Sequence, residues 1–136
     1  MKITVETLVK AGLGKVWDAW NSPEDIMQWN TAHESWHTPR STVDLREGGT
    51  FLSRMEARDG SMGFDFEGTY TRIVPQRLIE YSLGDERTVS VEFSEQEGGV
   101  LVRETFDAET QNDAEMQRQG WQAILDNFGR HVEQKG

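Results

Sequence analysis

The most specific chemical pattern in the chain is His33-Glu34-Ser35-Trp36-His37, which matches H-E-x-x-H letter for letter. On a helix, this spacing offers two imidazoles to a zinc ion and a glutamate as general base. That chemistry also needs a full helical turn, a third ligand and an open coordination position for water. Pro39 closes the segment, and the third histidine, His131, lies far along the sequence. We therefore expect no metal site and no cofactor.

Glu104 is the second residue that could do chemistry, because it lies within an apolar strand pattern. It shares parity with Val102 and Phe106, which would direct it to the same inward face. A carboxylate in an apolar pocket has a raised pKa and can act as an acid or a base. A β-bulge would instead turn the side chain outward, and that is the orientation we expect. No nucleophile motif or glycine-rich phosphate loop accompanies it, so no catalytic residue is assigned.

Bulky apolar side chains form a candidate binding set. Ligand pockets are mostly apolar, with a few polar groups that orient the guest. The same strand and helix periods are also typical of ordinary core packing, so the interpretation depends on the set rather than on any one member. The candidate ligand-binding residues are Trp29, Trp36, Met55, Phe64, Phe66, Tyr81, Gly120, Trp121 and Leu125. Trp17 and Trp20 are assigned to packing of a short amphipathic helix.

A long amphipathic helix over residues 112–134 must position the C-terminal members of this set. Its apolar stripe repeats every four residues and is widened by Trp121 and Leu125; the repeating members are Met116, Gly120, Ile124, Phe128 and Val132. At ~1.5 Å rise per residue the helix is about 34 Å long, so it needs a broad apolar cover. Gly120 costs about 1 kcal/mol relative to alanine. It leaves a space beside Trp121 for a ligand, or it allows close contact between helix backbone and sheet.

The N-terminal segment is expected to form a strand and two short helices. Ile3, Val5, Thr7 and Val9 alternate as a strand, and Leu13, Val16, Trp17 and Trp20 then share one helical face. Ser22 suits the cap of a second helix, with Pro23 at its first position and Glu24 and Asp25 at the positive end of its dipole. Residues 30–40 show no clean period and contain Pro39, so they are expected to form a loop or a frayed helical extension.

Residues 43–106 are expected to supply about six strands of one curved antiparallel sheet. The turn signals that separate them are Glu47-Gly48-Gly49, Arg58-Asp59-Gly60, Val74-Pro75, Leu83-Gly84-Asp85 and Glu97-Gly98-Gly99. Phe64, Phe66 and Tyr70 alternate on one face, and Asp65 and Glu67 take the other. Cross-strand ion pairs on the wet face are expected to involve such acids and the strand arginines Arg54, Arg72 and Arg103. The pattern predicts an α+β fold in which one sheet grips one helix.

Composition limits the remaining choices. The chain has 136 residues, which suits a single domain over 1–136, and a net charge of -10, which disfavours nucleic acid and anionic membrane surfaces as partners. The absence of cysteine excludes disulfides and thiolate chemistry. The chain starts with an alternating strand and has no run of about 18 apolar residues. We therefore expect a cytoplasmic protein without membrane insertion, and a monomer.

Several short segments together resemble a known family. They are Phe66-Glu67-Gly68-Thr69-Tyr70, Ile73-Val74-Pro75 with Leu78, Gly120-Trp121 ahead of Leu125-Asp126, Val16-Trp17 and Ser22-Pro23-Glu24. In this order they resemble the family named after the C-terminal domain of the activator of heat-shock protein 90 ATPase, within the START-like (SRPBCC, polyketide-cyclase-like) superfamily. The resemblance runs along essentially the whole chain. It implies a helix-grip fold of the START-like and Bet v 1-like type, with a cavity between the curved sheet and the C-terminal helix.

The resemblance leaves three functions open, since fold does not fix function. The superfamily includes lipid and hormone carriers, cyclases and dehydratases, chaperone regulators and many uncharacterised bacterial proteins. The leading expectation is non-catalytic binding of a small, largely apolar molecule, lipid-like or aromatic, between the sheet and Trp121. The alternatives are a protein-interaction module that regulates a chaperone, and a cyclase- or dehydratase-type enzyme that uses Glu104 or His33 as acid or base. The eukaryotic activator also carries a separate N-terminal domain, for which we expect no counterpart here.

Overall fold

The structure, a computed structural model, describes residues 1–135 and packs one antiparallel sheet of seven strands against helices. The elements in chain order are β1 (Lys2–Val9), α1 (Leu13–Asn21), α2 (Pro23–Trp29), β2 (Trp36–Val43), β3 (Thr50–Ala57), β4 (Gly63–Val74), β5 (Leu78–Ser82), β6 (Thr88–Gln96), β7 (Gly99–Asp107) and α3 (Ala114–Gln134). A strand, two short helices, six further strands and a long helix confirm the predicted α+β helix-grip architecture. None of the helices in the described chain is long and apolar enough to cross a membrane.

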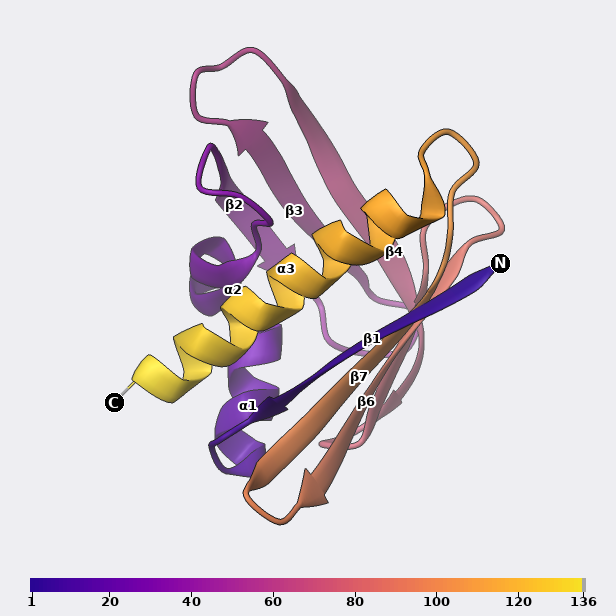
Figure 1. Cartoon of the computed structure of the whole chain (residues 1–136). Helices are drawn as coiled ribbons and strands as arrows, with labels where there is room; N and C mark the ends of the chain where they lie inside the picture. Colours follow the sequence, from indigo (N-terminus) through magenta and orange to yellow (C-terminus); the bar gives the residue numbers. More distant parts are fainter. Residues whose placement is uncertain (136) are drawn as a thin grey trace.

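The sheet bends around α3, which runs across its inner side (Figure 1). The strand order is β1-β7-β6-β5-β4-β3-β2, so β1 and β2 form its two edges. All five predicted turns separate strands where expected, and glycines with positive φ lie in four of them: Gly48, Gly60, Gly84 and Gly98. Positive φ carries no steric penalty at glycine, which is why these positions end one strand and start the next.

Residues 30–35 form a loop as expected, but the expectation was wrong for residues 36–40, because β2 begins at Trp36 and contains Pro39. Two local features make a proline acceptable there. β2 is an edge strand with only β3 as neighbour, and the β2–β3 register shifts between His37 and Arg40. Proline has no N–H to donate, and it is tolerated at edges and bulges because no ladder hydrogen bond is lost there.

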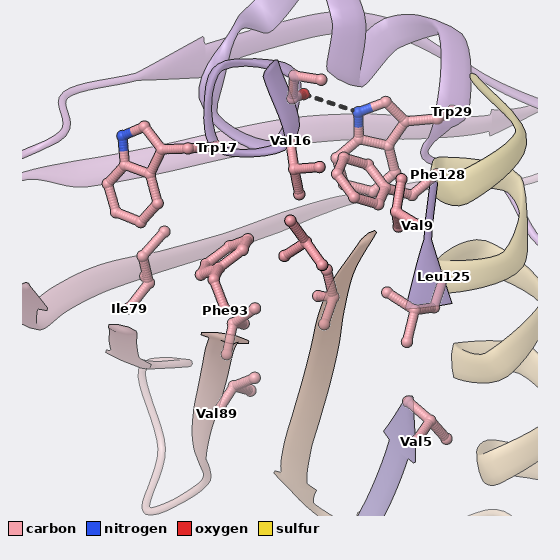
Figure 2. Close-up of a cluster of buried hydrophobic side chains, with 14 of the residues drawn as sticks. Val5, Val9, Val16, Trp17, Trp29, Ile79, Val89, Phe93, Leu125 and Phe128 are labelled. Carbon is pink, nitrogen blue, oxygen red and sulfur yellow. Dashed lines mark hydrogen bonds between the residues drawn. The ribbon is translucent and has the colours of Figure 1, made fainter. Parts of the chain in front are cut away.

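An aromatic cluster joins the three helices to the sheet. Phe128 of α3 meets the rings of Trp20 and Trp29 edge-on, each at a centroid distance of 4.9 Å. The Trp29 indole N–H donates to the Ala19 carbonyl oxygen at 3.0 Å, so α1 and α2 hold each other (Figure 2). Trp17 packs edge-on against Phe93 of β6 at 5.2 Å. This cluster fixes where α3 lies over the sheet.

The stripe predicted along α3 is buried toward its C-terminal end and exposed at its start. Leu125, Phe128 and Val132 are fully buried, whereas Met116 is 62% exposed, so its assignment to the buried stripe was wrong. Gly129 is also buried, and a Cβ there would lie 3.7 Å from atoms of Thr7 and Val9. The close approach of helix to sheet therefore falls at Gly129.

A buried ion cluster ties the end of α3 to α2. The Asp25 carboxylate lies 2.8 Å from His131 Nε2 and accepts hydrogen bonds from Lys135 Nζ at 2.9 and 2.8 Å. Burial alone would raise the pKa of Asp25, but the hydrogen bonds and charges of Lys135 and His131 hold it below its ordinary value. Ser22 occupies the predicted cap position of α2, but its side chain makes no capping hydrogen bond.

Candidate functional site

A cavity of about 560 Å³ lies between the inner face of the sheet and α3. Its walls come from α1 and α2, from strands β2, β3, β4, β5 and β7, and from α3. Aromatic side chains dominate the lining: Trp20, Trp29, Phe51, Phe64, Phe66, Tyr70, Tyr81, Phe106 and Trp121. Phe64 is 47% exposed, which places it at the rim, where the cavity reaches solvent. The volume and the apolar walls are those of a small-molecule site.

The structure brings six of the nine candidate binding residues to this cavity: Trp29, Met55, Phe64, Phe66, Tyr81 and Trp121. The other three lie elsewhere. Leu125 is fully buried in the core, and Gly120 and Trp36 are not part of the lining. Trp36 contacts Phe64 at a ring-centroid distance of 6.0 Å and faces a second, polar hollow outside. Trp20, which was assigned to packing, lines the cavity as well as supporting Trp29.

Trp121 is the main contribution of α3 to the cavity wall. Its indole stacks on Phe106 of β7, with ring centroids 3.9 Å apart and planes 9° from parallel. Phe66 of β4 meets it edge-on at 6.1 Å. Offset stacking and edge-to-face contacts are the favoured aromatic geometries, so the ring is held from two sides of the bent sheet. A guest in the cavity would meet a wall whose orientation is already fixed.

Glu104 points inward, so the expected outward orientation was wrong. β7 pairs without a bulge with both neighbours here, opposite Val5 of β1 and Val91 of β6, and strand parity therefore holds. The side chain lines the cavity and the residue is only 5% exposed. Within residues 1–135, no protein group hydrogen-bonds its carboxylate. Burial raises the pKa of Glu104 to about 8, because the charged form loses its water without gaining a partner.

Two tyrosines share the cavity with Glu104. Burial raises the pKa of Tyr81 well above its ordinary value, and the negative charges of Glu104 and Tyr70 add to the effect. Burial, with a smaller contribution from Asp44, raises the pKa of Tyr70 to about 12. Both hydroxyls are therefore neutral near pH 7 and able to donate. The cavity thus combines aromatic walls with a small set of polar groups grouped around Glu104.

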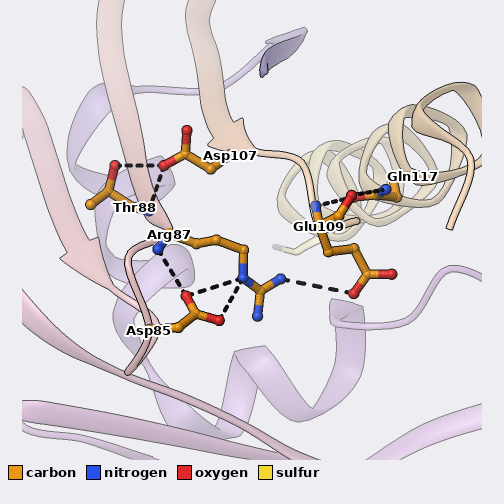
Figure 3. A network of polar contacts seen from close by, with 6 residues as sticks. All are labelled: Asp85, Arg87, Thr88, Asp107, Glu109 and Gln117. Atoms are coloured by element: carbon orange, nitrogen blue, oxygen red, sulfur yellow. Dashed lines mark hydrogen bonds and ion pairs between the residues drawn. The ribbon is translucent and has the colours of Figure 1, made fainter. Parts of the chain in front are cut away.

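A polar network lies beside the cavity, where β6, β7 and the segment before α3 meet (Figure 3). The Arg87 guanidinium lies 2.9 Å from Asp85 Oδ2 and 3.9 Å from Glu109 Oε2. Asp107 accepts hydrogen bonds from the Thr88 backbone N–H at 2.8 Å and its hydroxyl at 3.1 Å. The Gln117 side chain bonds the Glu109 backbone in both directions, at 2.9 and 3.1 Å. These contacts anchor the start of α3 to the sheet.

The H-E-x-x-H segment does not form a helix. His33 lies in a turn, where its Nδ1 lies 2.8 Å from Ser35 Oγ, and His37 lies in β2 with its Nε2 3.9 Å from Glu56 Oε1. His33 lines the polar hollow and lies outside the aromatic cavity. Among residues 1–135, no group of three or more histidine or acidic side chains is arranged to hold a metal ion. The helical spacing required for zinc chemistry is therefore missing at this segment.

The expected cross-strand ion pairs on the wet face occur at two places. Arg54 Nη1 lies 3.4 Å from Asp65 Oδ1, and Arg103 Nε lies 3.0 Å from Glu6 Oε2. Glu67 and Arg72 form no ion pair within the described part of the chain. These exposed pairs contribute little to stability, roughly 0.2–1 kcal/mol each.

The surroundings of Gly120 decide against one of the two interpretations of a glycine at this position of the helix. A Cβ at this position would meet no heavy atom within 4 Å. The interpretation that Gly120 allows close contact between the helix backbone and the sheet was therefore wrong. We expect Gly120→Ala to stabilise the protein by about 0.5–1 kcal/mol, because alanine removes the cost of glycine inside a helix and fills open space. Urea unfolding measures the change. Gly129→Ala, where a Cβ would contact Thr7 and Val9, serves as the comparison; equal or lower stability of Gly120→Ala than the parent would contradict the prediction.

Several lining residues were missing from the candidate set although the sequence carried signals for them. Tyr70 alternates with Phe64 and Phe66, and all three line the cavity. Phe106 has the same parity as Glu104, and the unbulged strand turns both inward. Phe51 has the same parity along β3 as Met55, and both line the cavity. Its contact with Tyr81, at a ring-centroid distance of 4.7 Å, depends on the order of β3, β4 and β5 in the sheet.

Comparisons with known proteins agree with this architecture. Residues 10–133 match the family model described as Activator of Hsp90 ATPase homolog 1-like protein. A solution structure of the AHSA1-like protein from Aeromonas hydrophila is 48% identical, with a TM-score of 0.91 over 98% of this chain and 92% of the other. A protein from Cytophaga hutchinsonii is 46% identical, with a TM-score of 0.85 over 97% and 92%.

A putative uncharacterized protein from Rhizobium leguminosarum is 28% identical, with a TM-score of 0.78 over 99% of this chain and 95% of that one. A search among curated proteins found no match. The family model covers nearly all of the chain, and two solved structures share almost half of its residues. The chain therefore belongs to the Activator of Hsp90 ATPase homolog 1-like family.

Proposed function

We propose that this protein binds a small, largely apolar molecule in the cavity between the sheet and α3, without covalent chemistry. The observation that carries the proposal is the cavity itself, about 560 Å³ in volume and walled mainly by aromatic rings. Pockets for drug-sized ligands span roughly 300–1,000 Å³. The fixed orientation of Trp121 on Phe106 lowers the ordering cost of binding.

The five tryptophans provide a built-in test. Trp20, Trp29 and Trp121 line the cavity, whereas Trp17 and Trp36 do not. Screening lipids, aromatics and polyketide-like compounds by NMR should shift the indole N–H signals of the first three and the amides of Trp121 and Phe66. Responses confined to Trp36 and other surface residues would contradict binding in the cavity.

Trp121→Ala is expected to weaken binding of any compound found in that screen by about tenfold or more, because the stacked wall is lost. Calorimetric titration measures the affinity. Trp36→Ala removes a ring of the same kind outside the cavity and should leave affinity unchanged. An equal loss in both variants would show that the ligand does not depend on the cavity wall.

An acid–base enzyme is a second candidate, because Glu104 is buried in the cavity with a pKa of about 8. A group that titrates near neutrality can both donate and accept a proton during turnover of a bound molecule. Glu104→Gln would then abolish turnover of a ligand that it still binds. Unchanged turnover in that variant would remove the candidate.

A chaperone-regulating role is what the family's name suggests. Its test is whether the protein is recovered with a bacterial 90-kDa heat-shock chaperone and changes that chaperone's ATPase rate. Failure of both measurements would leave small-molecule binding as the function to pursue.

A further inference from the structure

Glu104 is a buried carboxyl group in the cavity without a partner. It is 5% exposed, it lines the cavity, and no group within residues 1–135 donates a hydrogen bond to it. A buried polar group without a partner costs free energy, and a buried charge costs more. The other buried acid among the described residues shows the contrast: Asp25 is held by both His131 and Lys135. The cavity therefore contains an acceptor for which the protein itself supplies no donor.

The charged residues along the lining are mainly acidic: besides Glu104 they are Asp65, Glu67, Asp107 and Glu109, with Arg87 as the basic residue among the described residues. By strand alternation the side chains of Asp65, Glu67 and Asp107 belong to the outer face of the sheet, so Glu104 is the inward carboxyl of the strands. Arg87 already lies between Asp85 and Glu109 (Figure 3). Asp107 is paired with Lys2 at 3.0 Å, and Asp65 with Arg54. Among the described residues, no basic side chain of the lining is therefore free to pair with Glu104, and the net charge of -10 favours a cationic guest over an anionic one.

The aromatic walls favour the same kind of guest. Trp121, Phe66 and Tyr81 line the same cavity as Glu104, and aromatic faces attract cations. Aromatic faces combined with a carboxylate are suited to an ammonium group, which gains from both. A carboxylate or phosphate would be repelled by ionised Glu104 and by the net negative charge of the protein.

We infer that the ligand of this cavity is an apolar amine, whose ammonium group pairs with Glu104 while its apolar body fills the aromatic walls. This inference rests on the proposed binding function and names the chemical class of the ligand. The ammonium group supplies the positive charge that no described protein group provides for Glu104. The neighbouring Tyr81 hydroxyl is neutral.

The test uses three probes with one apolar body: naphthylmethyl-trimethylammonium, naphthylmethanol and naphthoate. Burial raises the pKa of Glu104 to about 8. Below pH 8 the carboxyl group is protonated, so a permanent cation can pair with it only after the proton has left. Affinity for the ammonium probe should rise about tenfold per pH unit from about pH 6 to 8 and then level off. The other titratable groups of the lining are Tyr70, Tyr81, Asp65, Glu67, Arg87, Asp107 and Glu109.

Calorimetry at roughly physiological ionic strength limits general attraction to the acidic surface. Above about pH 8, the ammonium probe should bind at least about tenfold tighter than the other two. Glu104→Gln should weaken it about 10- to 100-fold and remove the pH dependence. Glu92→Gln changes the same charge on the adjacent strand β6, at an exposed position outside the cavity, and should behave like the parent.

The outcomes separate the two proposals. The ammonium probe and the alcohol could both shift the Trp121 signals, bind with equal affinity and be unaffected by Glu104→Gln. That result would overturn the amine inference and leave the proposal of cavity binding intact. Tighter binding of the alcohol that weakens above about pH 8 would show that protonated Glu104 recognises a neutral acceptor, and would also overturn it. Failure of all three probes to shift the cavity tryptophans would contradict both proposals.

Discussion

At pH 8, the Glu104→Gln variant is expected to be more stable than the parent by on the order of 4 kcal/mol, whereas at pH 4 the two should be nearly equal. The reason is the difference between the pKa of about 8 in the folded chain and the ordinary value of 4.5. Below pH 4.5 the carboxyl is protonated in both states. Between 4.5 and 8 only the unfolded chain has released its proton, so each pH unit lowers the stability of the parent by about 1.4 kcal/mol. Above pH 8 the penalty is constant.

Urea unfolding of both chains at about pH 4, 6 and 8.5 measures this difference. Subtracting the two curves removes the contribution of every other titrating group that the substitution leaves alone. Glu92→Gln, at an exposed position, should give a curve parallel to that of the parent. A constant difference between Glu104→Gln and parent at all pH values would show that Glu104 ionises as freely in the fold as outside it.

Phe128→Ala is expected to destabilise the protein by about 3–5 kcal/mol. Phe128 is fully buried, and its ring is enclosed by Trp20 and Trp29. Its removal leaves a void at the point where all three helices meet, and rigid indoles cannot collapse into it. Because Trp20 and Trp29 also line the cavity, the variant should in addition weaken ligand binding.

Met116→Ala on the same helix is the matched control. Met116 is 62% exposed, so its truncation should change stability by no more than about 0.5 kcal/mol. Denaturant midpoints with unchanged slopes would show that both values report stability alone. Comparable losses in the two variants would mean that α3 is buried along its whole length, contrary to the structure.

The fold was largely predictable because its signals are local. Alternation placed Phe64, Phe66 and Tyr70 on one face, and glycine-rich turns separated the strands. Pro39 led to the wrong prediction for residues 36–40, because proline normally interrupts a strand. Whether a strand lies at a sheet edge depends on its neighbours, which a local pattern does not contain.

The site was predictable only in part, because a cavity is defined by residues that are distant in sequence. Strand alternation alone placed Glu104 on the inward face. Whether a bulge in β7 would reverse that orientation depends on the pairing of β7 with β1 and β6, which the sequence pattern does not contain. Trp36 and Leu125 are apolar and regularly spaced like their neighbours, yet one faces an outer hollow and the other the core. Periodicity indicates that a side chain is covered; it does not indicate whether protein or empty space covers it.

The bulged, proline-containing edge strand has a consequence for behaviour at high concentration. An exposed edge presents unpaired N–H and C=O groups that another molecule can extend into a continuous sheet. At β2, Pro39 lacks the N–H and the register shift at His37 interrupts the row. At β1, the Gln122 side chain of α3 donates to the Glu6 carbonyl oxygen at 3.0 Å and occupies one acceptor of that edge. Both borders thus resist the strand-to-strand joining that begins fibrous aggregation.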